Sequence, residues 1–223
     1  MNIQDQGGKP GAQLRLAAGQ DPAKRAQILA GANRVICKMG YDAASVSDIA
    51  REAGVSKGTI YVYFADKEDL FEALMEETRE QLFQALGAAL DGPGDTAERM
   101  RAYATMLVER LCSDPVIRAH RVIIGVTERM PEMGRRFYER GSTRGSKLFA
   151  EFLAAEVAAG RLVISDVALA AYQFAELSMA GLFRRRLFGH MAAEPSPEEV
   201  RRNVDAAVEM FLCRYGAGGA AIG

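Results

Sequence analysis

The sequence predicts an all-α fold in which short N-terminal helices precede a larger helical bundle. Apolar residues recur at helical spacing over most of residues 21–214, and capping residues stand before the periodic segments. Breakers rich in Gly, Pro or acidic residues, such as DGPGD at 91–95 and EPSPEE at 194–199, separate them. At 223 residues, with 49% apolar and 26% charged residues, the chain has ordinary globular composition and is long enough to bury a core.

The first predicted helix follows Asp21, an N-cap residue, and begins at Pro22, because proline is favoured at the first helical position. Its apolar residues recur at helical spacing until Gly40 stops the pattern. They are Ile28, Ala32, Val35, Ile36 and Met39. Residues 1–20 are rich in glycine, and we expect them to form a flexible leader.

Two short helices are predicted next. Ser45 caps a segment that ends at Gly54, and Asp48, three residues after the serine, completes a capping box. Ser56 then caps a third helix over residues 57–63. Two short helices joined by a tight turn after a longer helix form a helix-turn-helix, whose later helix enters the DNA major groove in proteins that use the motif. A fourth, longer helix is expected up to the breaker at 91–95.

The third helix begins with small, polar and cationic residues, as a helix that faces DNA requires. They are Ser56, Lys57, Gly58 and Thr59. A glycine inside an ordinary helix costs about 1 kcal/mol relative to alanine, which makes sense where the backbone must approach another molecule closely. The same run is also a common helix start, and Tyr61 and Tyr63 can be packing residues. Spacing alone therefore leaves DNA binding and simple packing both open.

The net charge of −1 argues against a nucleic-acid-binding protein, but the distribution of charge does not. Residues 1–67 contain nine Lys and Arg against six Asp and Glu, a balance of +3, and the rest of the chain is acidic by 4. A basic N-terminal part joined to an acidic body is compatible with one nucleic-acid-binding end, but a difference of this size also arises by chance.

Other classes of function find little support in the sequence. Cys37, Cys112 and Cys213 are too widely spaced for a zinc site, and their odd number does not suggest a disulfide framework. His120 and His190 have no clustered carboxylates, and no nucleophile has a base at a suggestive spacing, so we expect no metal, no cofactor and no catalytic residues. With no targeting or membrane-spanning segment evident, we expect a cytoplasmic protein without a membrane partner.

Residues 25–74, RAQILAGANRVICKMGYDAASVSDIAREAGVSKGTIYVYFADKEDLFEAL, closely resemble the N-terminal domain of TetR-family transcriptional regulators. The core of the match, DIAREAGVSKGTIYVYF followed by DKEDLF, is highly specific. The resemblance implies an N-terminal helix-turn-helix DNA-binding domain, here residues 21–68, and a C-terminal helical bundle for ligand binding and dimerisation, residues 69–215, followed by a flexible tail at 216–223. It also implies a homodimer that binds a double-stranded DNA operator, with repression relieved by a small-molecule effector.

The DNA contacts of the family carry over to residues on the second and third helices and just after the third. They are Ser45, Ser47, Ser56, Lys57, Gly58, Thr59, Tyr61, Tyr63 and Lys67. Arg25, at the start of the first helix, is expected to add a phosphate contact. One position departs from the family, because many relatives carry histidine or another polar residue where this chain has Val62. A hydrogen bond to a base edge is then in doubt at that position, and the valine either contacts a thymine methyl group or packs within the fold.

The body carries helical periodicity over 95–112, 114–129, 131–160, 166–190 and 196–214. Its segment RVIIGVTERMPEMGRRFYERG resembles a common C-terminal variant of the family. The segment at 167–183 is apolar almost all round, so it requires a second partner besides its own bundle. We therefore expect the last two helices to form the dimer interface, with a buried central helix as the alternative. The expected interface residues are Leu177, Val200, Val204, Val208 and Phe211.

An effector pocket is expected inside the body, among large or polar residues in otherwise apolar helices. The candidates are Arg121, Tyr138, Tyr172, Glu176 and Phe183, and each is more often a packing residue than a ligand contact. The sequence thus predicts a sequence-specific transcriptional regulator that is not an enzyme. An all-helical enzyme and an architectural DNA-binding protein are the alternatives.

Overall fold

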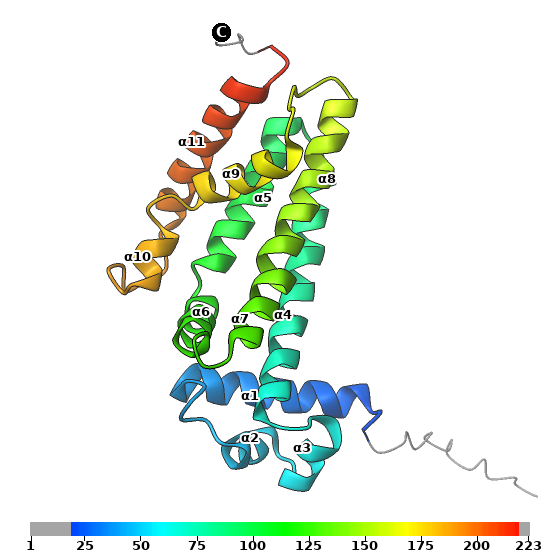
Figure 1. Cartoon of the computed structure of the whole chain (residues 1–223), viewed down its shortest axis with the longest axis vertical. Helices are drawn as coiled ribbons and strands as arrows, with labels where there is room; N and C mark the ends of the chain where they lie inside the picture. The colour runs from blue at the N-terminus through cyan, green and yellow to red at the C-terminus, as the bar shows by residue number, and fades with distance from the viewer. Residues whose placement is uncertain (1–18, 219–223) are drawn as a thin grey trace, which may run out of the picture. The chain divides into compact units, whose positions relative to one another are not determined.

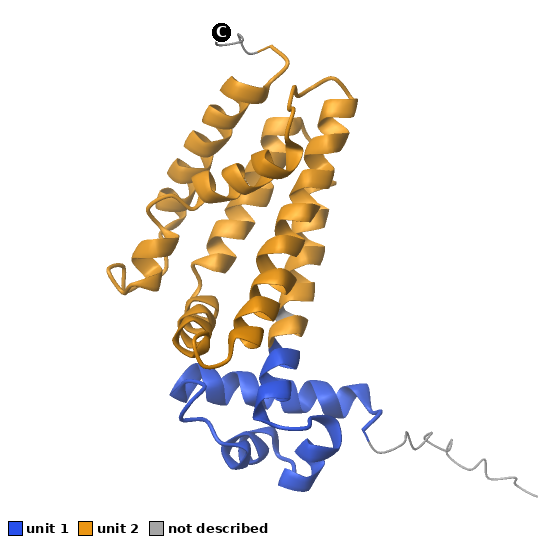
Figure 2. Ribbon diagram, viewed as in Figure 1, with its two compact units in different colours: residues 1–74 blue, residues 75–223 orange. Residues whose placement is uncertain are grey.

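The computed structural model describes residues 19–218, which lie in two compact units (Figure 2). The division falls between residues 74 and 75, inside the long helix α4 (Lys67–Leu90), whereas the sequence placed it between 68 and 69. Nearly all of the expected leader and the last residues of the expected tail lie outside the described residues. Within residues 19–218 no helix is long and apolar enough to cross a membrane.

Unit 1 contains α1 (Pro22–Met39), α2 (Val46–Ala53), α3 (Lys57–Tyr63) and the first turns of α4 (Figure 1). The caps that the sequence predicted are present. Asp21 accepts hydrogen bonds from the backbone of Ala23 and Lys24, and Ser45 and Asp48 form the capping box of α2. Gly54 ends α2 in the left-handed conformation, with φ of 67°, which favours glycine.

The core of unit 1 forms where α1 crosses α2. Ile28, Ala32 and Ile49 are fully buried there, with Ile60 of α3 beside them. The helices approach so closely at Gly31 that a Cβ atom on this residue would lie 2.6 Å from the Cβ of Ala53. Gln27 also joins the helices, because its side-chain amide donates to the carbonyl of Ala53 over 2.7 Å. Glycine at position 31 is therefore required by the packing of this unit.

Unit 2 contains the rest of α4 and the helices that follow it. They are α5 (Thr96–Leu111), α6 (Asp114–Val126), α7 (Pro131–Tyr138), a π-helical turn (Glu139–Thr143), α8 (Arg144–Ala158), α9 (Val167–Ser178), α10 (Phe183–Leu187) and α11 (Pro197–Tyr215). Two expected helices are interrupted. The one at 131–160 contains the π turn, and the one at 166–190 breaks after Ser178, where Gly181 has φ of 72° and cannot continue a helix.

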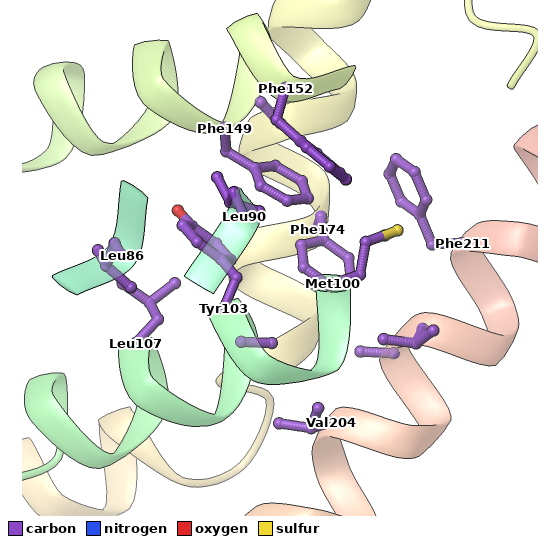
Figure 3. Packing of buried hydrophobic residues seen from close by; sticks show 14 of the residues in the cluster. Leu86, Leu90, Met100, Tyr103, Leu107, Phe149, Phe152, Phe174, Val204 and Phe211 are labelled. Atoms are coloured by element: carbon purple, nitrogen blue, oxygen red, sulfur yellow. The ribbon is translucent and has the colours of Figure 1, made fainter. Parts of the chain in front are cut away.

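Aromatic rings fill the centre of unit 2 (Figure 3). Phe149 of α8 stacks on Tyr103 of α5, with 4.6 Å between ring centroids, and on Phe174 of α9 over 4.7 Å. Phe211 of α11 meets Phe174 edge to face at 5.2 Å. Burial raises the pKa of the Tyr103 hydroxyl, as expected for a group enclosed by rings and aliphatic side chains.

The apolar stripe of α11 belongs to this core, which corrects the predicted dimer interface. Val200, Val204, Val208 and Phe211 are at most 2% exposed, and Figure 3 shows Val204 and Phe211 directed into the packed interior. These side chains are covered by their own chain, so they present no surface to a second copy. A helical stripe shows only that one face is buried, and here α5 and α9 cover it.

One end of unit 2 is held by a buried carboxylate. Glu156 of α8 is 1% exposed and accepts hydrogen bonds from Thr96, Arg99 and Arg161. Hydrogen bonding from Arg161, assisted by Thr96 and Arg99, lowers the pKa of Glu156 to about 2 although burial opposes this. The chain beside Arg161 pairs with the end of α11, because the Val163 amide donates to the Tyr215 carbonyl over 2.8 Å.

The expected flexible tail therefore begins with bonded residues. The Ala217 amide donates to the Arg161 carbonyl over 3.1 Å, and Gly216 pairs with Leu162.

The cysteines are all free thiols: Cys112 is buried, Cys37 is half-buried and Cys213 is exposed. Burial raises the pKa of the Cys112 thiol to about 11.

Candidate nucleic-acid interface

The helix α3 has one buried side and one open side. Ile60 is 1% exposed and anchors the helix to the core of unit 1. Successive residues of an α-helix turn by about 100°, so Gly58 and Val62 point almost directly away from Ile60. Val62 is 51% exposed and Tyr61 is 53% exposed, in agreement with this geometry. The outward side of α3 is therefore available to a partner of this unit.

The N-terminus of α3 is capped and presents polar groups. The Ser56 hydroxyl accepts a hydrogen bond from the Thr59 amide over 3.0 Å and is paired with the Thr59 hydroxyl over 2.8 Å. Free amides at a helix N-terminus, with the helix dipole behind them, favour an anion such as phosphate. The exposed ammonium of Lys57 stands in the same turn. This turn is thus suited to contact with a phosphate backbone.

The start of α2 is built in the same way. The Ser45 hydroxyl accepts from the Asp48 amide over 3.1 Å and also bonds to the Asp48 carboxylate over 2.5 Å. Hydrogen bonds from Ser45, with a smaller contribution from Arg51, lower the pKa of Asp48. Ser45 and Ser47 are both exposed at this helix end.

Gly58 has no packing reason within its own unit. A Cβ atom built on it would meet only the Ser56 hydroxyl oxygen, at 3.7 Å, which is an ordinary contact. Its φ is not positive, so the backbone does not require glycine either. The conformational cost of a glycine in this helix therefore has no compensation inside the described part of the chain.

The structure gives Lys67 a different role from the one that the resemblance implied. Its ammonium donates to the carbonyls of Tyr41 over 2.8 Å, Ala44 over 2.9 Å and Asp42 over 3.4 Å, and it lies 4.3 Å from the centre of the Tyr41 ring. An ammonium has three N–H donors, and these carbonyls use them. Lys67 therefore holds the connection between α1 and α2, and it has no free donor for the predicted phosphate contact.

The remaining predicted residues, Tyr61, Tyr63 and Arg25, lie on α3 or close to its C-terminal end. Tyr61 is exposed and Tyr63 is half-buried, with its ring 6.5 Å from that of Phe64. The exposed Arg25 guanidinium lies 5.5 Å from the centre of the Phe64 ring, a cation–π arrangement. Unit 1 thus brings together the predicted residues of α1, α2 and α3. Sequence reasoning left the placement of Val62 open, although its spacing from Ile60 was enough to find it.

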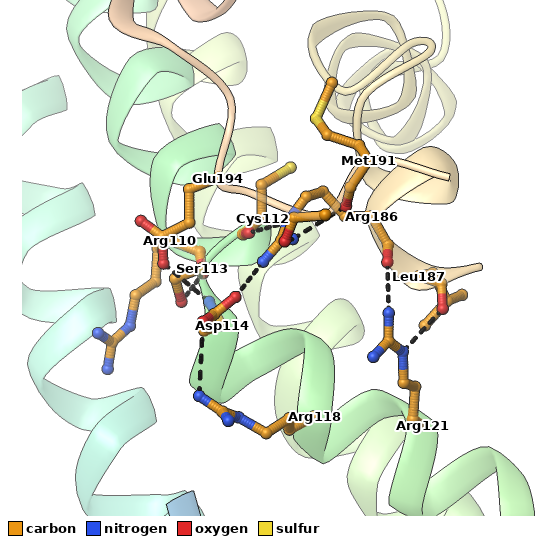
Figure 4. Close-up of polar contacts among 11 residues, drawn as sticks. Arg110, Cys112, Ser113, Asp114, Arg118, Arg121, Arg186, Leu187, Met191 and Glu194 are labelled. Carbon is orange, nitrogen blue, oxygen red and sulfur yellow. Dashed lines mark hydrogen bonds and ion pairs between the residues drawn. The ribbon is translucent and has the colours of Figure 1, made fainter. Parts of the chain in front are cut away.

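The predicted effector residues lie on α6, α7, α9 and α10 of unit 2. Arg121 donates to the carbonyls of Arg186 over 2.7 Å and Leu187 over 2.9 Å, so it caps the end of α10 (Figure 4). Tyr138 is exposed, whereas Phe183 packs against the His120 ring at 5.1 Å. Arg121 and Phe183 both lie where α6 meets α10, and Tyr138 lies on α7.

Beside Arg121, the buried Arg186 ties several segments together. Its guanidinium donates to the carbonyls of Cys112, Met191 and Ala192 and to the Asp114 carboxylate (Figure 4). This network fixes the chain between α10 and α11 against the junction of α5 and α6. It is a structural feature that the sequence did not reveal.

Tyr172, Glu176 and the predicted interface residue Leu177 lie on α9. An open groove of about 610 Å³ runs between α9 and α11, and it includes Glu176 and Leu177 but not Tyr172. Its lining residues are Gln173, Glu176, Leu177, Ala180, Met210, Phe211, Arg214 and Tyr215. Among residues 19–218 no group of three or more metal-ligand side chains lies close enough to hold an ion.

Two family models match the chain. Residues 28–74 match the model described as bacterial regulatory proteins, tetR family, and residues 98–217 match the AefR-like transcriptional repressor C-terminal domain. The second match alone covers more than half of the 223 residues.

Individual relatives agree with these models. HbdR, an HTH-type transcriptional regulator from Aromatoleum sp. (strain CIB), is 26% identical over 195 residues, which are 86% of this chain and 82% of that protein. The fatty acid metabolism regulator protein of Bacillus subtilis (strain 168) is 42% identical over 67 residues, 30% of this chain, and the match spans only 34% of that protein's length.

A solved structure shares both the fold and part of the sequence. The TetR-family transcriptional regulator from Mesorhizobium loti MAFF303099 superposes with a TM-score of 0.80 at 29% identity, over 87% of this chain and 97% of that one. The helix-turn-helix of unit 1, the bundle of unit 2 and both family models lead to the same assignment. This chain belongs to the TetR family of bacterial regulatory proteins.

Proposed function

We propose that this chain is a sequence-specific repressor that binds a palindromic DNA operator as a homodimer and releases it when a small molecule binds. The observation that carries the proposal is the exposure of α3. Ser56 caps the N-terminus of this helix, its first turn is polar, and its outward side is open to a partner. A helix-turn-helix dimer reads two half-sites about one helical turn apart. The residues proposed to contact DNA are Arg25, Ser45, Ser47, Ser56, Lys57, Gly58, Thr59, Tyr61 and Tyr63.

The DNA-binding part is tested by selecting binding sites from random duplex DNA and titrating the purified protein against the best site. Fluorescence anisotropy at two salt concentrations, with a scrambled duplex as control, gives the affinity and its salt dependence. We expect a selected site with two inverted half-sites, and affinity that falls as salt rises. Equal affinity for the scrambled duplex would favour the architectural alternative and would contradict the proposal.

A matched pair of variants then tests the placement of the interface. Lys57→Ala removes an exposed ammonium from α3, and we expect weaker binding together with a salt slope smaller by about one unit per subunit. Lys147→Ala removes the same charge from α8, where the lysine is exposed and lies 4.0 Å from Glu151. The second variant should bind DNA like the wild type. If both variants behave alike, Lys57 has no specific role.

For the homodimer we propose the outer sides of α9 and α11, in place of the buried stripe. Leu169 and Met210 are about half exposed there, and Tyr172 is 38% exposed. Met210 lines the groove that contains Leu177, and Leu169 and Tyr172 belong to α9, one of the two helices that form it. A second copy placed on the same surface by two-fold symmetry would cover all of them, and such self-complementary contacts are the commonest route to a homodimer.

Sedimentation velocity tests this surface. Met210→Arg places a charge on the proposed interface, and we expect it to shift the protein from dimer to monomer at micromolar concentration. Met39→Arg makes the same change at a 46% exposed methionine at the end of α1 and serves as the control. A dimer that persists in the Met210 variant would place the interface elsewhere.

Repression is supported by the C-terminal family model, which describes a repressor domain. We expect the effector to bind in unit 2, where the five candidate residues lie. A compound that stabilises the protein in a thermal-shift screen should weaken operator binding, and the operator should weaken compound binding by the same factor. A compound that binds without changing operator affinity would not be the effector.

A further inference from the structure

Val62 holds the most outward position of α3 apart from Gly58. Both residues lie opposite the buried Ile60, and they are one helical turn apart on the same side. Val62 is 51% exposed, so it contributes little to the core of unit 1. Val62 is thus an apolar side chain on the exposed side of α3, which unit 1 leaves open to a partner.

Among residues 19–218, Val62 has only partial cover. Beyond α3, Gly19 approaches it: a Cβ built on Gly19 would lie 3.4 Å from the Cγ1 of Val62 and 3.0 Å from its carbonyl oxygen. This contact covers one flank and leaves half of the side chain open. One turn earlier, Gly58 has no side chain. A partner can therefore approach the backbone of α3 closely beside Val62.

The chemistry of the major groove offers one group that fits an isolated valine. Base edges there present hydrogen-bond donors and acceptors, and the single apolar group among them is the C5-methyl of thymine. Valine cannot donate or accept a hydrogen bond, so it gains nothing from the polar edges of guanine, cytosine or adenine. Contact between the valine side chain and the thymine methyl group stabilises the complex, because both apolar groups are removed from water.

We infer that Val62 is a specificity-determining residue that contacts a thymine C5-methyl in each half-site, with Gly58 allowing the close approach. The inference rests on the proposed function, because it requires that α3 enters the major groove. It adds a chemical identity for one base: thymine is preferred because of its methyl group at the position that faces Val62.

Deoxyuridine substitution tests this contact, because uracil differs from thymine only by that methyl group. Each thymine of the selected site is replaced in turn by deoxyuridine, and the wild type and Val62→Ala are titrated against every duplex. For the wild type we expect one thymine in each half-site whose replacement weakens binding about fourfold, and about fifteenfold when both half-sites are changed. For Val62→Ala the same replacement should have almost no effect.

The other thymines supply the control, because their replacement should affect both proteins equally. Val62→Thr, which keeps the shape and one methyl group, should retain part of the sensitivity to uracil. Circular dichroism of each variant confirms that the half-exposed substitution leaves the helices intact.

Two outcomes would contradict the inference about Val62, and a third would contradict the proposed function as well. If the selected half-site has no thymine whose methyl group matters, or if that methyl matters equally to wild type and Val62→Ala, Val62 does not read it. If no duplex is bound in preference to scrambled DNA, the proposed function itself fails, and this is seen before any uracil is introduced.

Discussion

The inner and outer sides of the helix-turn-helix use the same residue types in opposite ways. On the inner side, Gly31 is pressed against Ala53, and the ammonium of Lys67 is surrounded by carbonyls. On the outer side, a Cβ on Gly58 would make only an ordinary contact with the Ser56 hydroxyl, and Lys57 is exposed. Each inner residue is explained by its neighbours in the same chain, whereas each outer residue is not.

This difference separates structural from functional residues without any alignment. A glycine or a lysine that its own unit requires should show its effect in stability. One that its unit does not require should show its effect in binding. The following substitutions test this distinction, beginning with the largest expected effect.

Gly31→Ala should destabilise the protein by about 2–3 kcal/mol, because the added methyl group would overlap Ala53 and force α1 away from α2. Urea denaturation followed by circular dichroism measures the change. A double variant with Ala53→Gly makes room for the new methyl group and should recover part of the loss. An unchanged urea midpoint for the single variant would show that α1 and α2 can move apart without a measurable loss of stability.

Lys67→Met keeps the aliphatic stem and removes the ammonium from the carbonyls of Tyr41, Asp42 and Ala44. Because these acceptors lose their donor, we expect a destabilisation of about 1–2 kcal/mol. The matched change on the outer side, Lys57→Met, should alter stability by less than about 0.5 kcal/mol. If Lys67→Met weakened DNA binding with no loss of stability, the family's phosphate contact would be restored for this residue.

Gly58→Ala should separate the two properties most clearly. Alanine fits the space inside the unit, and its higher helix propensity should stabilise the protein by up to about 1 kcal/mol. The same methyl group would stand between α3 and the DNA, so operator affinity should fall. Paired denaturation and anisotropy measurements are needed. A variant that is more stable and binds as well as the wild type would remove Gly58 from the interface.

The smallest effect on stability is expected from the protonation of His120 in unit 2. The His120 ring lies between Phe137 and Phe183, with centroids 5.0 and 5.1 Å away, and its Nδ1 is 2.8 Å from the Val116 carbonyl oxygen. Burial, with a smaller effect from the Arg79 charge, lowers the pKa of His120 below its ordinary value of 6.5. Protons then bind the unfolded chain more readily, so stability should fall as pH drops below about 6.5.

Urea denaturation at pH 7.5 and pH 5.5 measures this dependence. His120→Gln should remove most of the loss between the two pH values, whereas the exposed His190→Gln should keep it. An equal pH dependence in both variants would assign the effect to other groups.

The sequence was sufficient to predict the helices of unit 1 and their caps. The capping residues Asp21, Ser45 and Ser56 and the stop signal Gly54 act locally, so the ends of α1, α2 and α3 could be read from neighbouring residues. The all-α fold followed from the same periodicity and is confirmed. The outward direction of Val62 was equally available from helical spacing.

What the sequence did not reveal depends on contacts between distant segments. The stripe on α11 is buried in any arrangement, and only the fold shows that α5 and α9 cover it. Lys67 reaches carbonyls more than twenty residues earlier in the chain, and Arg121 caps a helix more than sixty residues later. Long side chains have many partners within reach, and local spacing does not choose among them.

The three thiols offer a direct way to study the arrangement of the two units. Cys112 is enclosed, and its high pKa keeps it in the unreactive protonated form, whereas Cys37 of α1 and Cys213 of α11 have access to solvent. One accessible thiol therefore lies in each unit of the natural sequence. Spin labels on them would report the distance between the units, free and on DNA, without a single substitution, and in the proposed homodimer they would report distances between the two copies as well.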